Sequence, residues 1–243
     1  MNLLILGANS DIAQSIAKIF AKKEHANLYL ASRDMEVLTK GAQDLAIRYQ
    51  VEAKPLYFDA LDFASHAEFY KSLQPKPDGV VVAFGYLGDQ KSAQEDFNES
   101  RKIMETNYLG AVSILEIIAA DFAARNRGFI IGLCSVAGER GRQSNYIYGS
   151  AKGAFIVYLS GLRNRLYRNG VYVLTALLGF VRTKMVADLN LPVRLSARPD
   201  EVAEDVYRAF TKKSDRIYSK WFWKWIMKII KLMAETLFKR TRL

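Results

Sequence analysis

Short apolar runs alternate with segments of helical periodicity along most of this chain. Leu3–Leu6 is an unbroken apolar run that stops at Gly7, which is typical of a buried strand. Over 11–23 the apolar side chains recur every three or four residues and share one helix face: Ile12, Ile16, Ile19 and Phe20. Further strands are expected over 27–31, 55–58, 79–84, 129–134, 171–178 and 217–218, and further helices over about 35–49, 98–125, 147–168 and 200–212. This alternation predicts an α/β fold with a doubly wound parallel sheet, whose ligand lies at the carboxyl ends of the strands.

Composition favours one globular domain. The chain has 243 residues, of which 50% are hydrophobic and 25% charged, so it is not of the disordered class. No internal repeat or Pro/Gly/Ser-rich linker divides it, and we expect one domain over 1–219 followed by a tail over 220–243. The single cysteine, Cys134, excludes a disulfide framework and fits a reducing compartment. With only two histidines besides, no metal site is expected.

The positive charge is concentrated in the tail. The formal net charge is +10, and residues 220–243 contain seven basic residues and one acidic residue. A nucleic-acid groove across the domain is therefore not favoured, and an anionic surface that meets the tail is the better partner. The longest uncharged run, 169–181, is too short for a spanning helix. The N-terminus lacks the basic region of a signal peptide, so we expect a cytoplasmic protein.

The turn after the first strand is a candidate phosphate site. It runs Gly7-Ala-Asn-Ser-Asp-Ile-Ala13 and opens a helix, whose first backbone N–H groups and dipole attract a phosphate. The expected contacts are Gly7, Asn9, Ser10, Asp11 and Ile12. One glycine is a weak signal, and an ordinary strand–helix turn with Ser10 or Asp11 as N-cap is equally compatible.

Two charged residues follow the next two strands. Arg33 stands where nucleotide-binding α/β folds often carry an acid for the ribose diol, and an arginine there accommodates a 2′-phosphate. An arginine at this position favours NADP(H) over NAD(H). The alternative is that Arg33 is a solvated loop residue with no part in binding. Asp59, after the third strand, can accept from an adenine amino group, and it can also cap the next helix.

Tyr148 and Lys152 are the strongest candidates for chemistry. On a helix, positions i and i+4 share a face, so Lys152 can lie beside the Tyr148 phenol and lower its pKa. Such a tyrosine can exchange a proton with a carbonyl or hydroxyl oxygen. Ser135, where the fifth strand ends, can hydrogen-bond the same oxygen. Tyr146 has no lysine four residues on, and the pair Tyr148/Lys152 taken alone also fits a solvated helix face.

Taken together, these residues resemble the short-chain dehydrogenase/reductase family over residues 2 to about 219. The resemblance rests on the glycine turn, Asp59, Phe84-Gly85, Asn107, Ser135, Tyr148/Lys152 and Leu178-Gly-Phe-Val-Arg-Thr183, all in the family's order. It implies a Rossmann-type fold with Tyr148 as general acid/base, Ser135 positioning the substrate oxygen, and Asn107 holding a water in a proton relay from Lys152. It further implies that the cofactor is contacted by Ala60, Ala83, Gly85, Tyr148, Lys152, Val181 and Thr183.

The chain departs from the family's pattern at three places. Asp11 and Ala13 replace two of the three usual glycines in the first turn, and Asp11 puts a carboxylate near the expected pyrophosphate. Val82-Ala-Phe-Gly85 replaces the usual Asn-Asn-Ala-Gly, and Leu178-Gly179 replaces Pro-Gly. These changes bear on cofactor affinity and leave the reacting residues in place.

The tail from Trp221 to Leu243 has the pattern of an interfacial helix. Its charged residues advance by three or four positions, and an apolar set is expected opposite them: Phe222, Ile226, Ile229, Ile230, Met233 and Leu237. Three tryptophans at its start favour a membrane interface. Docking on the chain's own core or on a subunit partner is the alternative. The tail and Ala83-Phe-Gly-Tyr-Leu-Gly-Asp-Gln90 also resemble bacterial decaprenylphosphoryl-2-keto-erythropentose reductases, which implies a lipid-phosphate-linked keto sugar.

The expected function is therefore an NADP(H)-dependent oxidoreductase that interconverts a ketone and a secondary alcohol. A peripheral site on the inner face of the membrane and a homo-oligomer are expected with it. The segment 184–197 is a candidate lid over the substrate. Two alternatives remain: a reductase of other membrane-borne ketones such as ketoacyl chains, and a cofactor-binding regulatory or scaffold protein without turnover.

Overall fold

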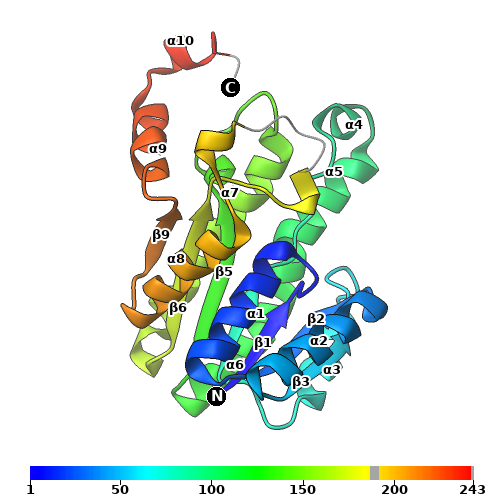
Figure 1. The fold of residues 1–243 in the computed structure, drawn as a ribbon. Helices are drawn as coiled ribbons and strands as arrows, with labels where there is room; N and C mark the ends of the chain where they lie inside the picture. The colour runs from blue at the N-terminus through cyan, green and yellow to red at the C-terminus, as the bar shows by residue number, and fades with distance from the viewer. Residues whose placement is uncertain (187–191, 242–243) are drawn as a thin grey trace.

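A seven-stranded parallel sheet forms the centre of the molecule (Figure 1). The computed structural model describes residues 1–186 and 192–241. The strand order is β3-β2-β1-β4-β5-β6-β9, with β1 Asn2–Leu6, β2 Asn27–Ser32, β3 Ala53–Tyr57, β4 Gly79–Val82, β5 Phe129–Ser135, β6 Tyr172–Leu178 and β9 Arg216–Ser219. The order reverses between β1 and β4, which creates a crevice at the carboxyl ends of the strands. A separate two-stranded sheet pairs β7 (Phe180–Val181) with β8 (Ser196–Ala197).

Helices cover both faces of the sheet, because successive strand residues point to opposite faces. Leu3 and Ile5 pack with α1 (Asp11–Glu24), α2 (Met35–Tyr49) and α8 (Pro199–Thr211). Leu4 and Leu6 belong to the second core, with α3 (His66–Ser72), α6 (Gly110–Arg125) and α7 (Tyr146–Leu166). The predicted α/β fold with a doubly wound parallel sheet is confirmed.

Several boundaries differ from the sequence predictions. The strand predicted over 79–84 ends at Val82, and the one predicted over 55–58 ends at Tyr57. Two short helices were not expected, α3 and α4 (Gln90–Glu95), because each is too short for a periodic pattern. The helix predicted over 98–125 is continuous but composite: α5 (Phe97–Met104), a π-helical turn over Glu105–Leu109, and α6.

The composite helix is also long and apolar enough, by length and composition, to cross a membrane. Nevertheless, one of its faces lies in the core against the sheet, with Ile114, Ile118 and Phe122 fully buried. We therefore describe it as a core helix.

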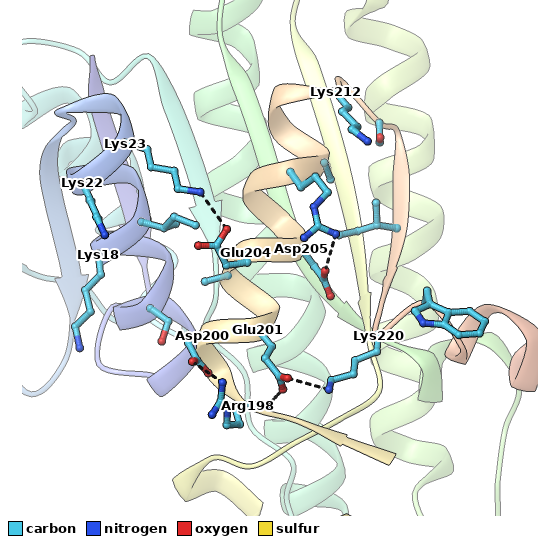
Figure 2. Close-up of a pocket in the computed structure, with 18 of the residues that line it drawn as sticks. Lys18, Lys22, Lys23, Arg198, Asp200, Glu201, Glu204, Asp205, Lys212 and Lys220 are labelled. Atoms are coloured by element: carbon cyan, nitrogen blue, oxygen red, sulfur yellow. Dashed lines mark hydrogen bonds and ion pairs between the residues drawn. The ribbon is translucent and has the colours of Figure 1, made fainter. Parts of the chain in front are cut away.

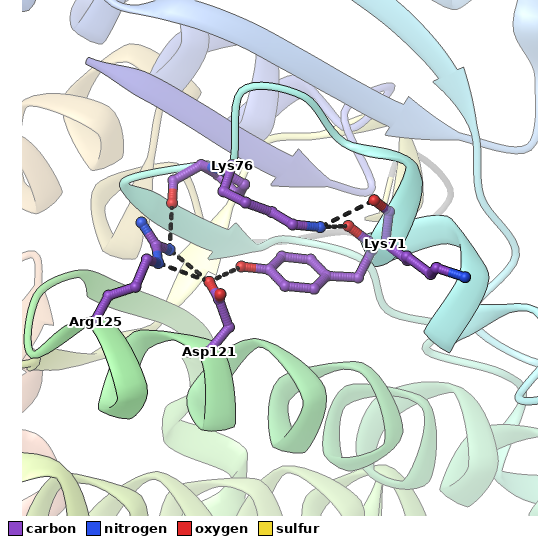
Figure 3. A network of polar contacts seen from close by, with 6 residues as sticks. Lys71, Lys76, Asp121 and Arg125 are labelled. Carbon is purple, nitrogen blue, oxygen red and sulfur yellow. Dashed lines mark hydrogen bonds and ion pairs between the residues drawn. The ribbon is translucent and has the colours of Figure 1, made fainter.

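A polar network ties α3 to α6 at the amino end of the sheet, away from the crevice (Figure 3). Asp121 accepts from the Tyr70 hydroxyl at 2.6 Å and from Arg125, which also donates to the Pro77 carbonyl at 2.9 Å. Lys76 donates to the Lys71 carbonyl at 3.0 Å. Burial raises the pKa of the Tyr70 phenol. These groups satisfy one another, so the network is structural.

The tail is not the single helix that its periodicity predicts. It consists of α9 (Trp223–Leu232) and a short α10 (Glu235–Phe238), separated by extended backbone at Met233 and Ala234. Figure 1 shows it following β9 along the edge of the sheet. Trp223, Met227 and Ile230 of α9 are buried against the domain.

The apolar set expected on one face of the tail is divided between the domain and the outer surface. Of its members, Ile230 is buried, but Ile229 and Leu237 are exposed. The inward face instead uses positions 223, 227 and 230, because docking selects the side chains that fit the domain.

Candidate active site

A cavity of about 260 Å³ opens at the carboxyl ends of β1, β2 and β4, in the crevice where the strand order reverses. Of the predicted cofactor residues it brings together Gly7, Asn9, Ser10, Arg33, Asp59, Ala60, Ala83 and Gly85. Its remaining lining residues were not among the predicted cofactor contacts: Ser32, Phe58, Leu61, Phe84, Tyr86, Lys102, Thr106 and Met185. Because ligands of such sheets bind at the carboxyl ends of the strands, the lining residues that directly follow a strand could have been predicted. Lys102 and Met185 belong to distant segments and could not.

The first turn requires glycine at position 7. Gly7 has φ +82°, and a Cβ there would lie 2.4 Å from the backbone nitrogen of Phe84. Ser10 is the N-cap of α1, and its hydroxyl accepts from the Ala13 N–H at 3.1 Å. Asn9 donates to the Asp34 carbonyl at 2.8 Å, while its buried Oδ1 has no partner among the described residues. The turn therefore combines a close backbone approach, a helix N-terminus and an unsatisfied polar atom, which suits a bound phosphate.

Asp11 does not leave a free carboxylate in this turn. Its Oδ2 accepts from the backbone N–H of Lys184 at 2.8 Å, 173 residues along the chain. Ile12, its neighbour, packs against the core and contributes no polar group. The carboxylate that Asp11 places near the phosphate site is therefore occupied by the segment that follows β7.

The charged groups of the cavity favour an anionic ligand. Arg33 is exposed at its rim, beside Ser32, and Lys102 reaches it from α5 with Nζ 4.3 Å from the centroid of the Tyr86 ring. Asp59 is the one acidic residue in the lining, and its Oδ1 accepts from the Leu61 N–H at 3.0 Å. Asp59 does not cap the next helix, because Ser65 occupies the N-cap position of α3.

Asn107 connects the cavity to the predicted catalytic residues. It is buried in the π-helical turn, where its Nδ2 donates to the carbonyls of Tyr86 at 2.6 Å and Ile103 at 2.9 Å. Its Oδ1 accepts from the Tyr86 N–H at 3.2 Å. A Cβ on Gly85 would lie 2.9 Å from this Oδ1 and 3.5 Å from Lys152 Nζ, so glycine keeps the strand end close to both groups.

Ser135, Tyr148 and Lys152 meet beside this point. Ser135 ends β5 and its hydroxyl accepts from the Ala137 N–H at 3.1 Å, so it is also the cap of the short 3₁₀ turn Val136–Glu139. Lys152 is buried on α7, with Nζ 3.3 Å from the Leu133 carbonyl and 5.8 Å from the centroid of the Tyr148 ring. Close backbone packing holds the turn on α7, since a Cβ on Gly138 would lie 2.6 Å from the Gly153 nitrogen.

The protonation of Tyr148 differs from the sequence prediction. Burial raises the pKa of the phenol above its ordinary value, and the Ser135 hydroxyl, as its hydrogen-bond partner, opposes this rise. Burial also lowers the pKa of the Lys152 ammonium. The expected lowering of the Tyr148 pKa by Lys152 is therefore not the net effect in this structure, where desolvation is the largest influence on the phenol. A phenol that keeps its proton is suited to donate it.

Val181 and Thr183 do not line the cavity, although both were expected to contact the cofactor. Val181 is buried, with its backbone paired to Ala197, whereas Met185 of the same segment lines the cavity. The candidate lid 184–197 includes 187–191, which lie outside the described residues.

A second hollow of about 670 Å³ adjoins the first and shares Gly85, Tyr86 and Met185 with it. Its lining contains three acids, Asp89, Asp96 and Glu99. Glu99 accepts from the Tyr86 hydroxyl at 2.8 Å, and Asp89 accepts from the Ser92 N–H at 2.8 Å. Carboxylates in this position offer acceptors to a ligand with hydroxyl groups.

A larger hollow, of about 890 Å³, lies elsewhere, between α1, α8 and β9 (Figure 2). Most of its charges are paired with one another: Lys23 with Glu204 at 3.1 Å, Lys220 with Glu201 at 2.9 Å, and Arg198 with Asp200 at 3.2 Å. None of Asn107, Ser135, Tyr148 or Lys152 lines it. They do not line the cavity at the carboxyl edge either, but Gly85, which does line it, lies next to Asn107 Oδ1 and Lys152 Nζ, so we place the candidate active site at that edge.

Comparisons with known proteins give the relatives of this chain. The family model described as short chain dehydrogenase matches residues 1–193. An uncharacterized oxidoreductase of Mycobacterium tuberculosis is 33% identical over 98% of this chain and 96% of its own. An NADP-dependent 3-hydroxy acid dehydrogenase of Schizosaccharomyces pombe is 26% identical, over 88% of each chain.

Solved structures share the fold at low sequence identity. A 7β-hydroxysteroid dehydrogenase matches with a TM-score of 0.87 at 18% identity, covering 99% of this chain and 96% of the other. A short-chain dehydrogenase from Sphingobium yanoikuyae in complex with NADPH matches with a TM-score of 0.83 at 20% identity, covering 96% of each.

Proposed function

Because the chain belongs to the short-chain dehydrogenase family of NAD(P)-dependent oxidoreductases, we propose that it reduces a ketone to a secondary alcohol with NADPH. The observation that carries the proposal is the half-buried Tyr148, whose phenol lies beside Ser135 and has Lys152 one helical turn away. These groups do not line the cavity that suits a dinucleotide, but Gly85, which lines it, closely approaches Lys152 Nζ.

The chain's own residues hold the substrate and move the proton. Ser135 donates to the carbonyl oxygen and orients it toward the Tyr148 hydroxyl. Tyr148 donates its proton to that oxygen as negative charge develops, because its raised pKa keeps it protonated at neutral pH. Lys152, with Nζ 5.8 Å from the centroid of the Tyr148 ring, would stabilise the phenolate that remains, and Asn107 would hold a water in the proton relay from Lys152. Bound NADPH supplies the hydride to the carbonyl carbon.

The residues at the rim support NADP(H) over NAD(H). Arg33 offers a guanidinium and Ser32 a hydroxyl to a 2′-phosphate, while the carboxylate of the next residue, Asp34, caps α2 by accepting from the Val37 N–H at 3.2 Å. The Schizosaccharomyces pombe relative, whose name describes it as NADP-dependent, supports the same choice. Gly7, Asn9 and Ser10 would hold the pyrophosphate, and Asp59 with Ala60 would contact the adenine.

The substrate that we propose is a hydroxylated ketone carried on a lipid phosphate, such as a keto sugar. The three carboxylates of the second hollow accept hydrogen bonds from hydroxyl groups and repel a carboxylate substrate. The lipid part is supported by the outward face of α9, where Trp225, Ile229 and Leu232 are 53%, 67% and 76% exposed.

This outward face supports a peripheral position on an anionic membrane. Lys224, Lys228 and Lys231 lie beside the exposed apolar side chains, and Trp221 lies at their start, 73% exposed. An apolar strip with adjoining lysines and tryptophan suits the interface between headgroups and acyl chains. A homo-oligomer is proposed with it, supported by Val157 and Tyr167 on the outer side of α7 and just beyond its end.

The same face favours a second candidate, a reductase of other membrane-borne ketones such as ketoacyl chains. Rates of turnover on different ketones distinguish the two candidate functions. NADPH oxidation is measured with an undecaprenyl- or decaprenyl-phosphate-linked keto sugar, the corresponding free keto sugar, and a 3-ketoacyl thioester. The proposal predicts the highest kcat/KM for the lipid-linked sugar. Faster turnover of the thioester favours the second candidate, and no turnover of any ketone favours a regulatory or scaffold protein.

A further inference from the structure

Three charged side chains of the loop between Ser135 and Tyr148 are held by the tail and its strand. Glu139 is the last residue of the 3₁₀ turn Val136–Glu139, and Arg140 and Arg142 follow it. Each of them contacts α9, the segment after it, or both. The loop that carries the candidate catalytic serine is thus attached to the C-terminal 20 or so residues of the chain.

Arg140 makes the most extensive of these contacts. Its guanidinium donates to the carbonyls of Ile230 and of Met233, the latter at 2.7 Å, at the C-terminal end of α9. It also donates to the Glu235 carboxylate at 2.9 Å and lies 3.8 Å from the centroid of the Phe238 ring. Carbonyls at a helix C-terminus lack intrahelical partners and carry partial negative charge. A guanidinium there supplies hydrogen-bond donors to these carbonyls and a positive charge that offsets theirs. The Arg140 side chain is only 14% exposed.

Glu139 and Arg142 hold the same loop from either side. Glu139, 3% exposed, accepts from Lys231 of α9 at 2.5 Å, from Arg216 at 2.6 Å and from the Tyr218 hydroxyl at 2.9 Å. Arg142 donates to the Met227 sulfur at 3.2 Å, and burial lowers the pKa of its guanidinium. The charges of the loop are thereby balanced largely by groups of β9 and α9.

A displacement of this loop would reach the catalytic residues through backbone packing. A Cβ on Gly138 would lie 2.7 Å from the Lys152 carbonyl carbon, and a Cβ on Gly149 would lie 2.7 Å from the Ala137 carbonyl oxygen. The turn and α7 therefore touch through their backbones on both sides of the Tyr148–Lys152 segment. There is no flexible side chain between them that could absorb a shift.

We propose that Arg140 is a positioning residue, which uses the docked tail to hold Ser135 and α7 in the arrangement that the reaction needs. The tail is then part of the active site as well as a surface for binding. This inference rests on the proposed reaction at Tyr148. It also assigns the two sides of α9 to different partners: the side with Trp223, Met227 and Ile230 to the domain, and the side with Trp225, Ile229 and Leu232 to the membrane.

The test compares Arg140→Ala and Arg140→Lys with the parent enzyme in the full chain. Misplacement of reacting groups by about 1 Å can cost up to ~100-fold in rate, and we expect kcat of Arg140→Ala to fall about ten-fold or more. The dissociation constant for NADPH should stay within about two-fold of the parent's, because the cofactor cavity lies on other strands. Arg140→Lys, which keeps the charge and part of the reach, should recover part of kcat. The control is Arg165→Ala, which removes another arginine that anchors α7, paired with Glu116 at 2.6 Å.

Parental kcat in Arg140→Ala would overturn the proposal, and so would an equal loss of kcat, NADPH affinity and melting temperature, which describes general destabilisation. If Arg140→Ala does not fold, Arg140→Lys decides by the same criteria. Amide hydrogen exchange over 135–149 separates this inference from the proposed function. Faster exchange in Arg140→Ala than in Arg165→Ala supports the coupling even if the parent turns over none of the ketones tried, and equal exchange overturns it.

Discussion

The carboxylate of Asp11 accepts a hydrogen bond from the backbone N–H of Lys184 at 2.8 Å. This contact joins the start of α1, at the edge of the cofactor cavity, to the segment that carries Met185 into the same cavity. It gives a structural reason for an acidic residue at a position where a glycine is usual. The carboxylate is occupied by a backbone donor, so its charge is partly offset where a pyrophosphate would approach.

The Asp11 contact predicts an effect on substrate more than on cofactor. Asp11→Ala removes the acceptor, and hydrogen bonds to charged groups contribute about 1.5–3 kcal/mol. We expect a several-fold rise in KM for the ketone, because the segment from Lys184 loses its attachment. Asp11→Asn keeps a carbonyl acceptor and should stay near the parent in ketone KM. Steady-state kinetics with NADPH saturating measures both, and identical behaviour of the two variants would contradict this role.

Arg33 is expected to set the choice of cofactor. A charge-assisted contact with the 2′-phosphate contributes roughly 1.5–3 kcal/mol, so Arg33→Ala should weaken NADPH binding by about ten-fold or more and leave NADH binding unchanged. Arg48→Ala serves as the control, since Arg48 is an exposed arginine of α2 paired with Asp44. Titration of both cofactors by fluorescence measures the four constants. Equal weakening of NADPH and NADH would remove Arg33 from this role.

The outward face of α9 predicts salt-sensitive binding to anionic vesicles. Each lysine near an anionic surface contributes about 1 kcal/mol, and salt weakens this contribution over a Debye length of ~8 Å. Lys224→Glu with Lys228→Glu should abolish the salt-dependent binding without touching the Glu139 contact of Lys231. Trp225→Ser with Ile229→Ser should weaken the salt-resistant part. Co-sedimentation is the measurement, with Lys18→Glu and Lys22→Glu on α1 as the charge-matched control; no sedimentation of the parent at low salt rejects the membrane surface.

The raised pKa of Tyr148 predicts how reduction depends on pH. The ordinary tyrosine pKa is about 10, and burial moves it upward, so the donor proton is present throughout the neutral range and is lost only above pH 10. The kcat/KM for ketone reduction, which reports the free enzyme, should therefore show no fall between pH 7 and 9 that Tyr148 causes. A fall with a pKa near 7 that disappears in Tyr148→Phe would mean that Lys152 controls the phenol after all.

Local patterns in the sequence were enough to predict the sheet and most helices, and to place Tyr148 and Lys152 on one helix face. Gly7 ends an apolar run, and Tyr148 and Lys152 lie one helical turn apart, so short-range geometry specifies both features. Contacts between distant segments have no such signal. Asp11 meets Lys184 and Arg140 meets the end of α9 only because the fold brings them together.

The tail is a second case in which local sequence patterns do not predict contacts between distant segments. Its residues have a continuous helical period and no Gly or Pro, yet α9 ends at Leu232. Arg140 donates hydrogen bonds to the carbonyls at that end. Trp223 packs closely against Gly179, where a Cβ would collide with the indole ring. Tertiary contacts therefore decide where the helix stops and which of its faces is buried, and propensity alone cannot give either.

The most direct test of the account is the kcat of Tyr148→Phe. This variant keeps the ring and removes the proton donor, and positioned acid/base groups contribute typically ~10²–10⁴-fold. We predict that kcat for ketone reduction falls by that order while the dissociation constant for NADPH stays within about two-fold. Tyr146→Phe, two residues away and 41% exposed, is the matched control and should retain parental turnover. Near-parental kcat in Tyr148→Phe would contradict the assignment of the proton donor and with it the proposed reaction at this site.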